Sequence, residues 1–515
     1  MSRSIHDAPA RRSPIGSPLR GRTRPAGRAA ALVALALIAA ACTASGGTAG
    51  PTTTASAGSA TSTSAAASSA VSATTGTTTD GTGVGTTTGA AVPAPPGGAA
   101  AGGGSTDSGL ASTATGAYAQ SGGTADKAGL SVTAANADES GVLVTDAGTL
   151  TLTDVTVNTT GQTSSSDNSS FYGLNAGILS TGGSSITVTG GSITTTGSGA
   201  NGAFASGTGS SVTLSDVRIS ATGDGGHGAM ATQAGTVTVT DVDMHTTGAH
   251  GAPLATARGG GTLVATGGTI VADGTDSPGI YSTGSISVTG ATITATGAEA
   301  AVIEGGNTID LTDTRLASST ADKWGVMMYQ SMSGDATGTQ GTFTMTGGSL
   351  TDSAATSPLF YVTNSTAIIT LQGVAVSAAS STLVDAAAGS CGTTGSNGGA
   401  AVLIADGVSL TGDMVADAIS SLSVTLRNGT ELTGALDAPC TARAADLTLD
   451  ATSTWRVTAD SHLTRLTDGT GISGTAITNI VGNGHTVTYD ATDAANSTLG
   501  GLTYTLVGGG TLTPA

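Results

Sequence analysis

The sequence predicts an all-β solenoid of three-stranded coils, a parallel β-helix, preceded by a disordered N-terminal region. Two observations lead to this prediction. A thirteen-residue pattern recurs along the chain, as SITVTGGSITTTG at 185–197, SVTLSDVRISATG at 211–223 and SISVTGATITATG at 285–297. The composition is also unlike that of an ordinary globular protein, with 81 glycines, 3% aromatic residues and 10% charged residues. The core is therefore expected to consist of Val, Ile, Leu and Ala.

Each repeat opens on a glycine and holds three short runs in which apolar and polar residues alternate. The opening glycines are Gly141, Gly177, Gly202, Gly228, Gly251, Gly279 and Gly325. Alternation with a period of two predicts strands, and the Gly, Asp and Asn residues at the joins predict turns. Three short strands in a fixed period are typical of a parallel β-helix, because one coil buries its apolar side only when another coil stacks on it.

Aspartate and glycine replace each other at the corner between the second and third strands of the repeats. Aspartates stand there at Asp154, Asp216, Asp241 and Asp313, and glycines at Gly190, Gly267, Gly290 and Gly347. This exchange predicts a turn with unusual backbone angles. A calcium site at the corner has no supporting loop motif.

The first 41 residues have the pattern of a bacterial secretion signal. Seven arginines precede an apolar run of thirteen residues, Ala29 to Ala41, which is too short to span a bilayer. Cys42 follows directly, and IAAAC resembles a lipobox, although Ala39 stands where a leucine is usual. We expect Cys42 to be acylated and to anchor the chain at the extracellular face of the cell membrane. The alternative is a plain secretory signal in which Cys42 is incidental.

The remaining chain divides into a tether and a folded part. Residues 42–105 are almost entirely Thr, Ser, Ala and Gly with a single charge, so we expect them to be disordered. The β-helix is predicted over 106–515, with 399–515 as its C-terminal coils. Without the signal segment, 9 Lys and Arg and 33 Asp and Glu remain, which gives a net charge of 9 − 33 = −24. Such a charge disfavours nucleic-acid binding.

The repeats over about 129–515 resemble those of the pectin-lyase-like right-handed β-helix proteins, especially adhesin-type autotransporter passengers. The segment LTLDATSTWRVTADSHLTRL at 447–466 resembles the closing coils of such passengers. The resemblance implies a right-handed helix that binds a glycan or another cell-surface ligand. A polysaccharide-processing enzyme is the alternative that the resemblance also allows. The family's catalytic motifs have no counterpart here, so we assign no catalytic residue and expect no cofactor.

Threonines line one expected outer face of the solenoid. With Ile186 and Val188 facing the core, Thr187 and Thr189 face outward. The same alternation places further threonines on this face, at Thr213, Thr238 and Thr240. The array resembles that of β-helical ice-binding proteins, but the strand propensity of threonine explains it equally well. These five residues are candidate ligand contacts, and ice binding is a second alternative function.

The first strand of each repeat has apolar residues in two adjacent columns. The bulky column contains Leu143, Leu179, Phe204, Met230, Tyr281, Ile303 and Met327, and the smaller one contains Val142, Ile178, Ala203, Ala229, Ala252, Ile280 and Val302. A strand buries only alternate residues, so only one of these columns faces the core. We expect the bulky column to face inward, since large apolar residues are usually buried. The reverse arrangement exposes an apolar ridge suited to binding.

Two histidines directly precede the opening glycines of consecutive coils. His227 and His250 should therefore stack about one coil apart. Two imidazoles can share a metal ion, but a closed zinc site needs four ligands, and we see no cysteine or reliable carboxylate in this column. We expect solvated turn histidines and no metal site.

The other two cysteines are predicted to form a disulfide. With Cys42 assigned to lipid, Cys391 and Cys440 remain in a chain exported to an oxidising compartment. The bridge requires Cα atoms within about 7 Å of each other. Two separate buried thiols are the alternative.

The lipid anchor gives a direct prediction. Replacing Cys42 with alanine should release the protein from membranes into the medium, because no other segment is expected to hold it there. Fractionation of the producing cells measures the release, and mass spectrometry should find a diacylglyceryl group on the wild-type protein. A variant that stays in the membrane fraction, with no lipid on the wild type, would contradict the prediction.

Overall fold

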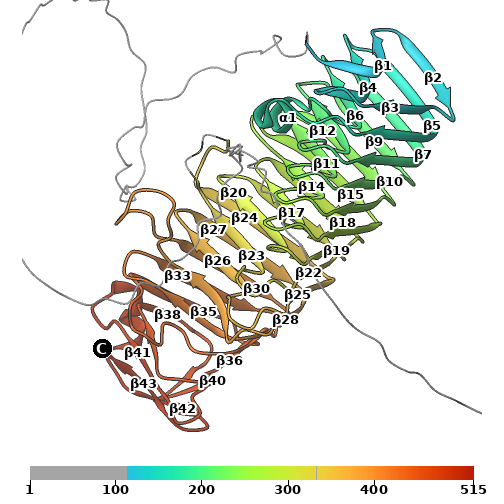
Figure 1. Ribbon diagram of the computed structural model, residues 1–515. Coiled ribbons are helices and arrows are strands. Elements are labelled where there is room, and N and C mark those ends of the chain that lie inside the picture. The colour runs from blue at the N-terminus through green and yellow to red at the C-terminus, as the bar shows by residue number, and fades with distance from the viewer. Residues whose placement is uncertain (1–112, 332, 334) are drawn as a thin grey trace, which may run out of the picture. The chain divides into compact units, whose positions relative to one another are not determined.

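The computed structural model describes residues 113–515 except 332 and 334. These residues form a right-handed parallel β-helix of about 16 turns (Figure 1). The predicted fold class is therefore confirmed. The signal segment, the tether at 42–105 and Cys42 lie outside the described residues. Within the described part, no helix is long and apolar enough to cross a membrane.

The strands form three sheets, which we call sheets A, B and C. Sheet A holds the first strand of each coil: β1 (Thr115–Ser121), β4 (Glu139–Thr145), β6 (Ile178–Thr181), β8 (Ala203–Ser206), β11 (Ala229–Thr232), β14 (Leu254–Thr256), β17 (Ile280–Ser282), β20 (Ala301–Glu304), β23 (Val326–Tyr329), β26 (Phe360–Thr363), β29 (Thr382–Ala386) and β32 (Asp413–Ala416). Every neighbouring pair in sheet A is parallel. The first strand, β1, begins one coil before the first repeat recognised in the sequence.

Sheet B supplies the other two sides of each coil. Its strands are β2 (Thr124–Ala128), β3 (Ser131–Ala134), β5 (Thr149–Thr159), β7 (Ser185–Thr195), β9 (Ser211–Ser215), β10 (Arg218–Ala221), β12 (Gly235–Thr240), β13 (Asp243–Thr246), β15 (Gly261–Thr266), β16 (Thr269–Ala272), β18 (Ser285–Thr289), β19 (Thr292–Ala295), β21 (Thr308–Thr312), β22 (Arg315–Ser318), β24 (Gln340–Thr346), β25 (Ser349–Asp352), β27 (Thr366–Gln372), β28 (Ala375–Ala378), β30 (Ala400–Asp406), β33 (Ser421–Arg427), β35 (Ala444–Leu449) and β38 (Arg465–Thr467). The strands β5 and β7 run through the corner, whereas later coils divide there into two strands. The corner residues adopt positive φ, as at Asp154 (51°), Gly190 (73°) and Asp216 (57°). The predicted turn geometry is therefore confirmed.

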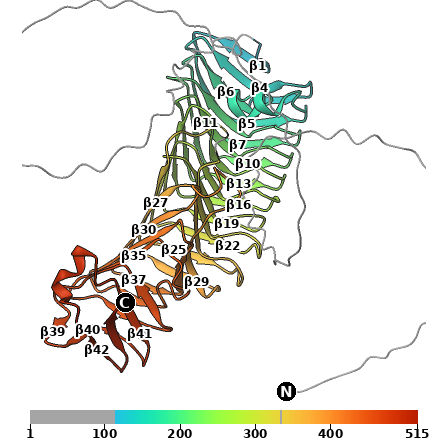
Figure 2. The same cartoon turned by 90° about the vertical axis from the view of Figure 1, so that its left-hand side faces the viewer.

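Sheet C closes the C-terminal end of the stack (Figure 2). Its strands are β31 (Ser409–Thr411), β34 (Glu431–Thr433), β36 (Thr454–Arg456), β37 (Ser461–Leu463), β39 (Ile472–Ser473), β40 (Ala476–Val481), β41 (Thr486–Tyr489), β42 (Tyr504–Val507) and β43 (Thr511–Pro514). The pairs β39–β40 and β42–β43 are antiparallel, so the regular stacking of coils ends there. A short 3₁₀ helix at Ala494–Leu499 precedes β42.

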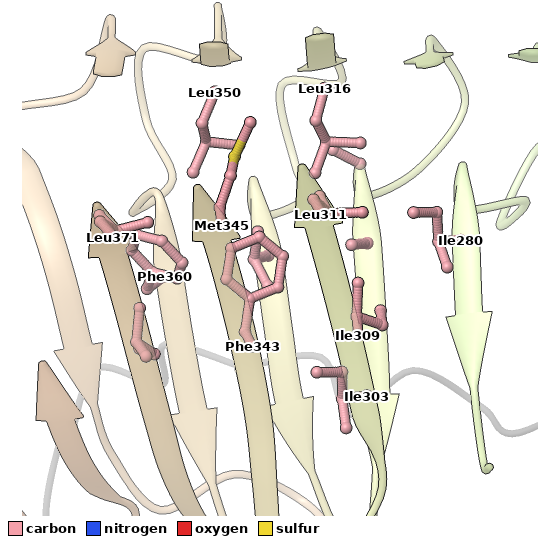
Figure 3. Close-up of a cluster of buried hydrophobic side chains, with 14 of the residues drawn as sticks. Ile280, Ile303, Ile309, Leu311, Leu316, Phe343, Met345, Leu350, Phe360 and Leu371 are labelled. Carbon is pink, nitrogen blue, oxygen red and sulfur yellow. The ribbon is translucent and has the colours of Figure 1, made fainter. Parts of the chain in front are cut away.

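Aliphatic residues from all three sides of the coils fill the interior. Apolar side chains stack from coil to coil, as Figure 3 shows for Leu311, Met345 and Leu371, which pair in successive coils. Phe343 and Phe360 meet edge to face, with ring centroids 5.9 Å apart. The chain is poor in aromatic residues, so most of the core consists of Val, Ile, Leu and Ala as expected.

The structure reverses the predicted orientation of the first strands. The smaller residues, such as Ile178 and Ala203, face the core of the β-helix. The bulky residues, such as Leu179 and Phe204, form a separate cluster on the outer side of sheet A. The strand β20 also falls in a different register, since Ile303 faces inward and Val302 outward. The prediction failed because the bulky residues find cover on the outer side of sheet A, where Phe171 packs against Leu179 and Phe204.

A short helix covers part of the outer side of sheet A. The helix α1 (Ser166–Tyr172) lies in the longest loop between the first repeats. Ser165 caps its N-terminus, and Gly173 ends it in the left-handed conformation with φ 77°. Phe171 packs with Leu179 and Phe204, which are both fully buried. The bulky column is thus buried locally by an inserted loop and does not form an exposed ridge here.

A column of glycines sets the distance between coils on the loop that returns to sheet A. Its members are Gly161, Gly197, Gly223, Gly248, Gly274 and Gly297. A Cβ atom on Gly223 would overlap the carbonyl oxygen of Gly197, and one on Gly248 would overlap that of Gly223. The coils therefore stack at the spacing of backbone hydrogen bonds, about 4.8 Å, only because no side chain stands at these positions.

The predicted disulfide between Cys391 and Cys440 is not formed, because Cys440 is a free and exposed cysteine. Cys391 follows β29, whereas Cys440 follows Leu436, which bridges to β32. The segments that contain the two cysteines therefore belong to coils that lie two steps apart along the stack. Two steps of about 4.8 Å exceed the Cα separation of about 7 Å that a disulfide tolerates.

The glycine column gives a stability prediction. Gly223→Ala should lower the free energy of unfolding by about 3 kcal/mol, because its Cβ can fit only if two coils move apart. Gly290→Ala is the matched control, since Gly290 has φ 69° and open space around its Cβ position. It should cost only about 1 kcal/mol of backbone strain. Urea unfolding measures both, and equal losses would contradict the packing role of the column.

Candidate functional site

The structure places the candidate threonines on the outer face of sheet B. Thr187, Thr213 and Thr238 pair with one another in successive coils and share one column. Thr189 and Thr240 lie in the next column, two residues along each strand. All five are at least partly exposed. Their outward placement follows the predicted alternation, and a ligand for them stays a prediction.

The two histidines lie in different surroundings. His227 is buried, its Nδ1 lies 3.2 Å from the carbonyl oxygen of Ala252, and its backbone N–H donates to Asn201. Burial lowers the pKa of His227 to about 4, so the ring is neutral at physiological pH. His250 occupies a turn with φ 59°. Across the described residues, no three His, Cys, Asp or Glu side chains come together as a metal site. His227 is therefore a buried structural residue, not the solvated one expected.

Aromatic and acidic residues gather on the outer side of sheet A, beyond the part that α1 covers. We call this surface the acidic–aromatic face, and its members are Tyr281, Glu304, Trp324, Tyr329, Tyr361, Asp385 and Asp417. Tyr281, Tyr361 and Asp385 belong to one column, with Val302 and Met327 between the first two. Glu304 and Tyr329 pair in a second column, two residues along. The regular stacking thus turns residues far apart in sequence into neighbours.

Glu304 is a buried carboxylate surrounded by hydroxyl groups. Tyr281 and Tyr329 donate hydrogen bonds to its Oε2 at 2.5 and 3.1 Å. Ser331 and Ser333 donate to its Oε1. Burial, together with the charge of Glu304, raises the pKa of both tyrosines well above the usual value. Four donors satisfy this carboxylate, so its role is to hold strands and the following loop in place.

Tyr361 and Trp324 stack at the centre of the face. Their ring centroids lie 4.2 Å apart with an interplanar angle of 9°. Tyr361 is only 2% exposed, and its hydroxyl is buried without a hydrogen bond of normal geometry. Burial raises the pKa of Tyr361, and the nearby charges of Asp385 and Asp417 add to the increase. Other buried polar side chains among the described residues, such as Thr195 and Asp352, also hold an oxygen without a hydrogen bond, so this feature does not by itself mark a site.

Asp385 and Asp417 are neighbouring carboxylates with opposite pKa shifts. Burial and the charge of Asp417 raise the pKa of Asp385 to about 6. Partial burial acts in the same direction on Asp417, but hydrogen bonds from the backbone N–H groups of Ala388 and Ile419 outweigh it and lower its pKa. Neither carboxylate is ion-paired with a described Lys, Arg or His. The pair is therefore an uncompensated acidic site.

The sequence pattern placed Tyr281 in this column but missed Tyr361, Asp385 and Asp417. The repeat loses its opening glycine after Gly325, and the loop at 387–399 breaks the period. Alternation within LFYVT at 359–363 and TLVDA at 382–386 was the available signal, because it puts Tyr361 and Asp385 in the register of Tyr281.

No family model, curated protein or solved structure matches this chain. The fold is a right-handed parallel β-helix on the evidence of its own strands. The chemistry of the site is therefore argued from the geometry of the acidic–aromatic face.

Asp385 gives a prediction for the pH dependence of stability. Its pKa is about 6 in the folded protein, whereas the usual pKa of an aspartate is 3.8, so the folded state binds more protons between these two pH values. Stability from this group is present below about pH 4 and is lost as the pH rises through 6. Above pH 7, the free energy of unfolding of Asp385→Asn should therefore be about 1–2 kcal/mol higher than that of the wild type.

Chemical unfolding at pH 4 and pH 8 measures this effect. The difference between Asp385→Asn and the wild type should vanish at pH 4. Asp310→Asn, at an exposed position of sheet B, serves as the control and should show no such pH-dependent gain. A gain of the same size at both pH values would contradict the assignment to ionisation of Asp385.

Proposed function

We propose that this protein binds a saccharide at the acidic–aromatic face. A lipid on Cys42 would anchor the β-helix at the cell surface. One observation supports the proposal above all: Asp385 and Asp417, which are partly exposed and have no ion pair with a described Lys, Arg or His, lie next to each other on the outer side of sheet A. Saccharides present many hydroxyl groups, which donate to carboxylates and to tyrosine oxygens. Sites with few, well-placed polar groups against an apolar wall are typical of small-ligand recognition.

The geometry also suits a chain-like ligand. Asp385 pairs with Val415 of the next coil, which Asp417 follows, and all three are partly exposed. A chain-like ligand can therefore contact neighbouring coils about 4.8 Å apart here. Weak contacts at several coils then add through a high effective concentration. The buried Trp324–Tyr361 stack is the rigid wall behind the exposed carboxylates.

Hydrolysis of the saccharide is a second candidate, favoured by the opposite pKa shifts of Asp385 and Asp417. A carboxylic acid and a carboxylate are the pair that glycoside hydrolysis requires. Asp385 would give its proton to the glycosidic oxygen as the C–O bond breaks. Asp417 would take a proton from the attacking water, whose oxygen forms the new C–O bond. Shortening of an added oligosaccharide distinguishes this activity from binding alone.

Ice binding through the threonine columns is the weaker expectation. Thr238 pairs with Val264, and Ser287 pairs with Asp310, so the column is interrupted twice. No feature of the described structure beyond the threonines themselves points to ordered water at this surface.

The proposal predicts where saccharide binding is lost. On an oligosaccharide array, Asp385→Asn combined with Asp417→Asn should weaken binding at least about tenfold, as expected for two lost charge-assisted contacts. Thr238→Ala on sheet B is the matched control and should stay within about twofold of the wild type, as is usual for an exposed change. A loss caused by Thr238→Ala but not by the double variant would place the ligand on sheet B.

A further inference from the structure

We infer that Lys127 prevents the N-terminal end of the β-helix from stacking on a second copy of this chain. The partner that this end fits is another N-terminal end, because both present the same three strands. Stacking of this kind would continue the coils of one molecule into the next. The role of Lys127 is independent of the saccharide proposed above and concerns a different surface.

The first coil of the described residues is paired on one side only. It consists of β1, β2 and β3, and β1 and β2 lie at one end of the stack in Figure 1. The strand β1 pairs with β4, and both β2 and β3 pair with β5. Within residues 113–515, no other strand pairs with these three. An unpaired edge is a template for a further strand, and proteins block such edges with lysine or with inward-pointing charges.

The same end is partly apolar. Tyr118, Leu130 and Val132 pack against the core but stay partly exposed. Their counterparts in the next coil are fully buried, since Tyr118 pairs with Val142 and Val132 pairs with Val157. A coil placed on this end would therefore bury apolar surface and complete the backbone hydrogen bonds of three strands. Both effects favour association.

Lys127 stands in a column that is apolar in every later coil. It pairs in register with Leu152, which is fully buried in the core. The column continues through successive coils as Val188, Leu214, Val239, Ala265, Val288, Leu311, Met345, Leu371, Ala405, Leu426 and Leu449, all of them buried. Lys127 is exposed, and it is the charged member of this column.

The charge of Lys127 is uncompensated. The sequence contains one other lysine, Lys323, which is ion-paired with Asp276 at 2.7 Å. Lys127 has no ion pair with a described Asp or Glu. Its neighbour Asp126 belongs to the outer side of β2, because it pairs in register with Thr151. A carboxylate on that side does not accompany the ammonium into the core.

Stacking would bury this charge. A coil of a second molecule would lie about 4.8 Å from β2 and would enclose the Lys127 ammonium in the apolar column. In a pair of ends related by a twofold axis, two such ammonium groups would enter one interior. Burial of like charges without partners is strongly unfavourable and opposes the gain from apolar contact and hydrogen bonds.

The C-terminal end of the stack is closed by the chain itself. The antiparallel pair β42–β43 and the 3₁₀ helix at Ala494–Leu499 end the regular coils there. Among the described residues, no such element covers the first coil. A charged side chain in the core column is therefore the device that blocks stacking at the N-terminal end.

Replacing Lys127 with leucine tests this role. Lys127→Leu completes the apolar column, so it should raise the self-association constant at least about hundredfold, as expected when burial of an unpaired charge no longer opposes stacking. Sedimentation equilibrium measures the constant. The full chain carries Cys42→Ala, so that a lipid does not cause association, and a reducing buffer keeps Cys440 from cross-linking. Electron microscopy should show two β-helices joined end to end.

Two variants in the same strand are matched controls. Lys127→Arg keeps the positive charge and should stay monomeric, like the wild type. Asp126→Leu adds the same apolar side chain to β2 on its outer side, so it should also stay monomeric. Circular dichroism and thermal unfolding confirm that each variant is folded.

Three results would overturn the inference. The first is a folded Lys127→Leu variant whose association constant equals that of the wild type. The second is equal association of Asp126→Leu, which would attribute the effect to added apolar surface and not to the core column. The third is a wild-type protein that already pairs through its N-terminal ends, since Lys127 would then fail to prevent stacking.

Discussion

The stacking of one backbone coil on the next is the constraint on which the rest of the structure depends. Each coil hydrogen-bonds to its neighbours at about 4.8 Å, so every position repeats along the axis at that spacing. Glycines such as Gly223 allow this distance, because any side chain there would overlap the carbonyl oxygen of the coil before. The inner side of sheet A packs into the core with small residues such as Ala203 and larger ones such as Ile178 and Phe360.

The same constraint creates the candidate site. Several of the larger and polar residues of sheet A, such as Phe204, Tyr361 and Asp385, stand on its outer side. Stacking then aligns them into columns, which brings Tyr361 and Asp385 into register although 24 positions separate them in the chain. Satisfied groups such as Glu304, with its four hydroxyl donors, hold this surface in place. The partly exposed carboxylates of Asp385 and Asp417, which have no ion pair with a described Lys, Arg or His, are the groups that a ligand could contact.

The repeat period was enough to predict the β-helix, the turn at Asp154 and Asp216, and the outward threonines of sheet B. It failed for sheet A, because periodicity says that alternate residues share a side but not which side is inside. Ala203 faces the core, and Phe204 faces outward, where Phe171 covers it. The disulfide failed for a related reason, since Cys391 and Cys440 lie in different coils. Asp385 and Asp417 stayed hidden because loops of unequal length precede them.

A structure of the protein with a bound oligosaccharide tests the central claim most directly. The account places sugar hydroxyl groups within about 3 Å of the Asp385 and Asp417 carboxylates, as hydrogen bonds to a carboxylate require. A ligand lying across the threonines of sheet B, with Asp385 and Asp417 still facing solvent, would contradict it.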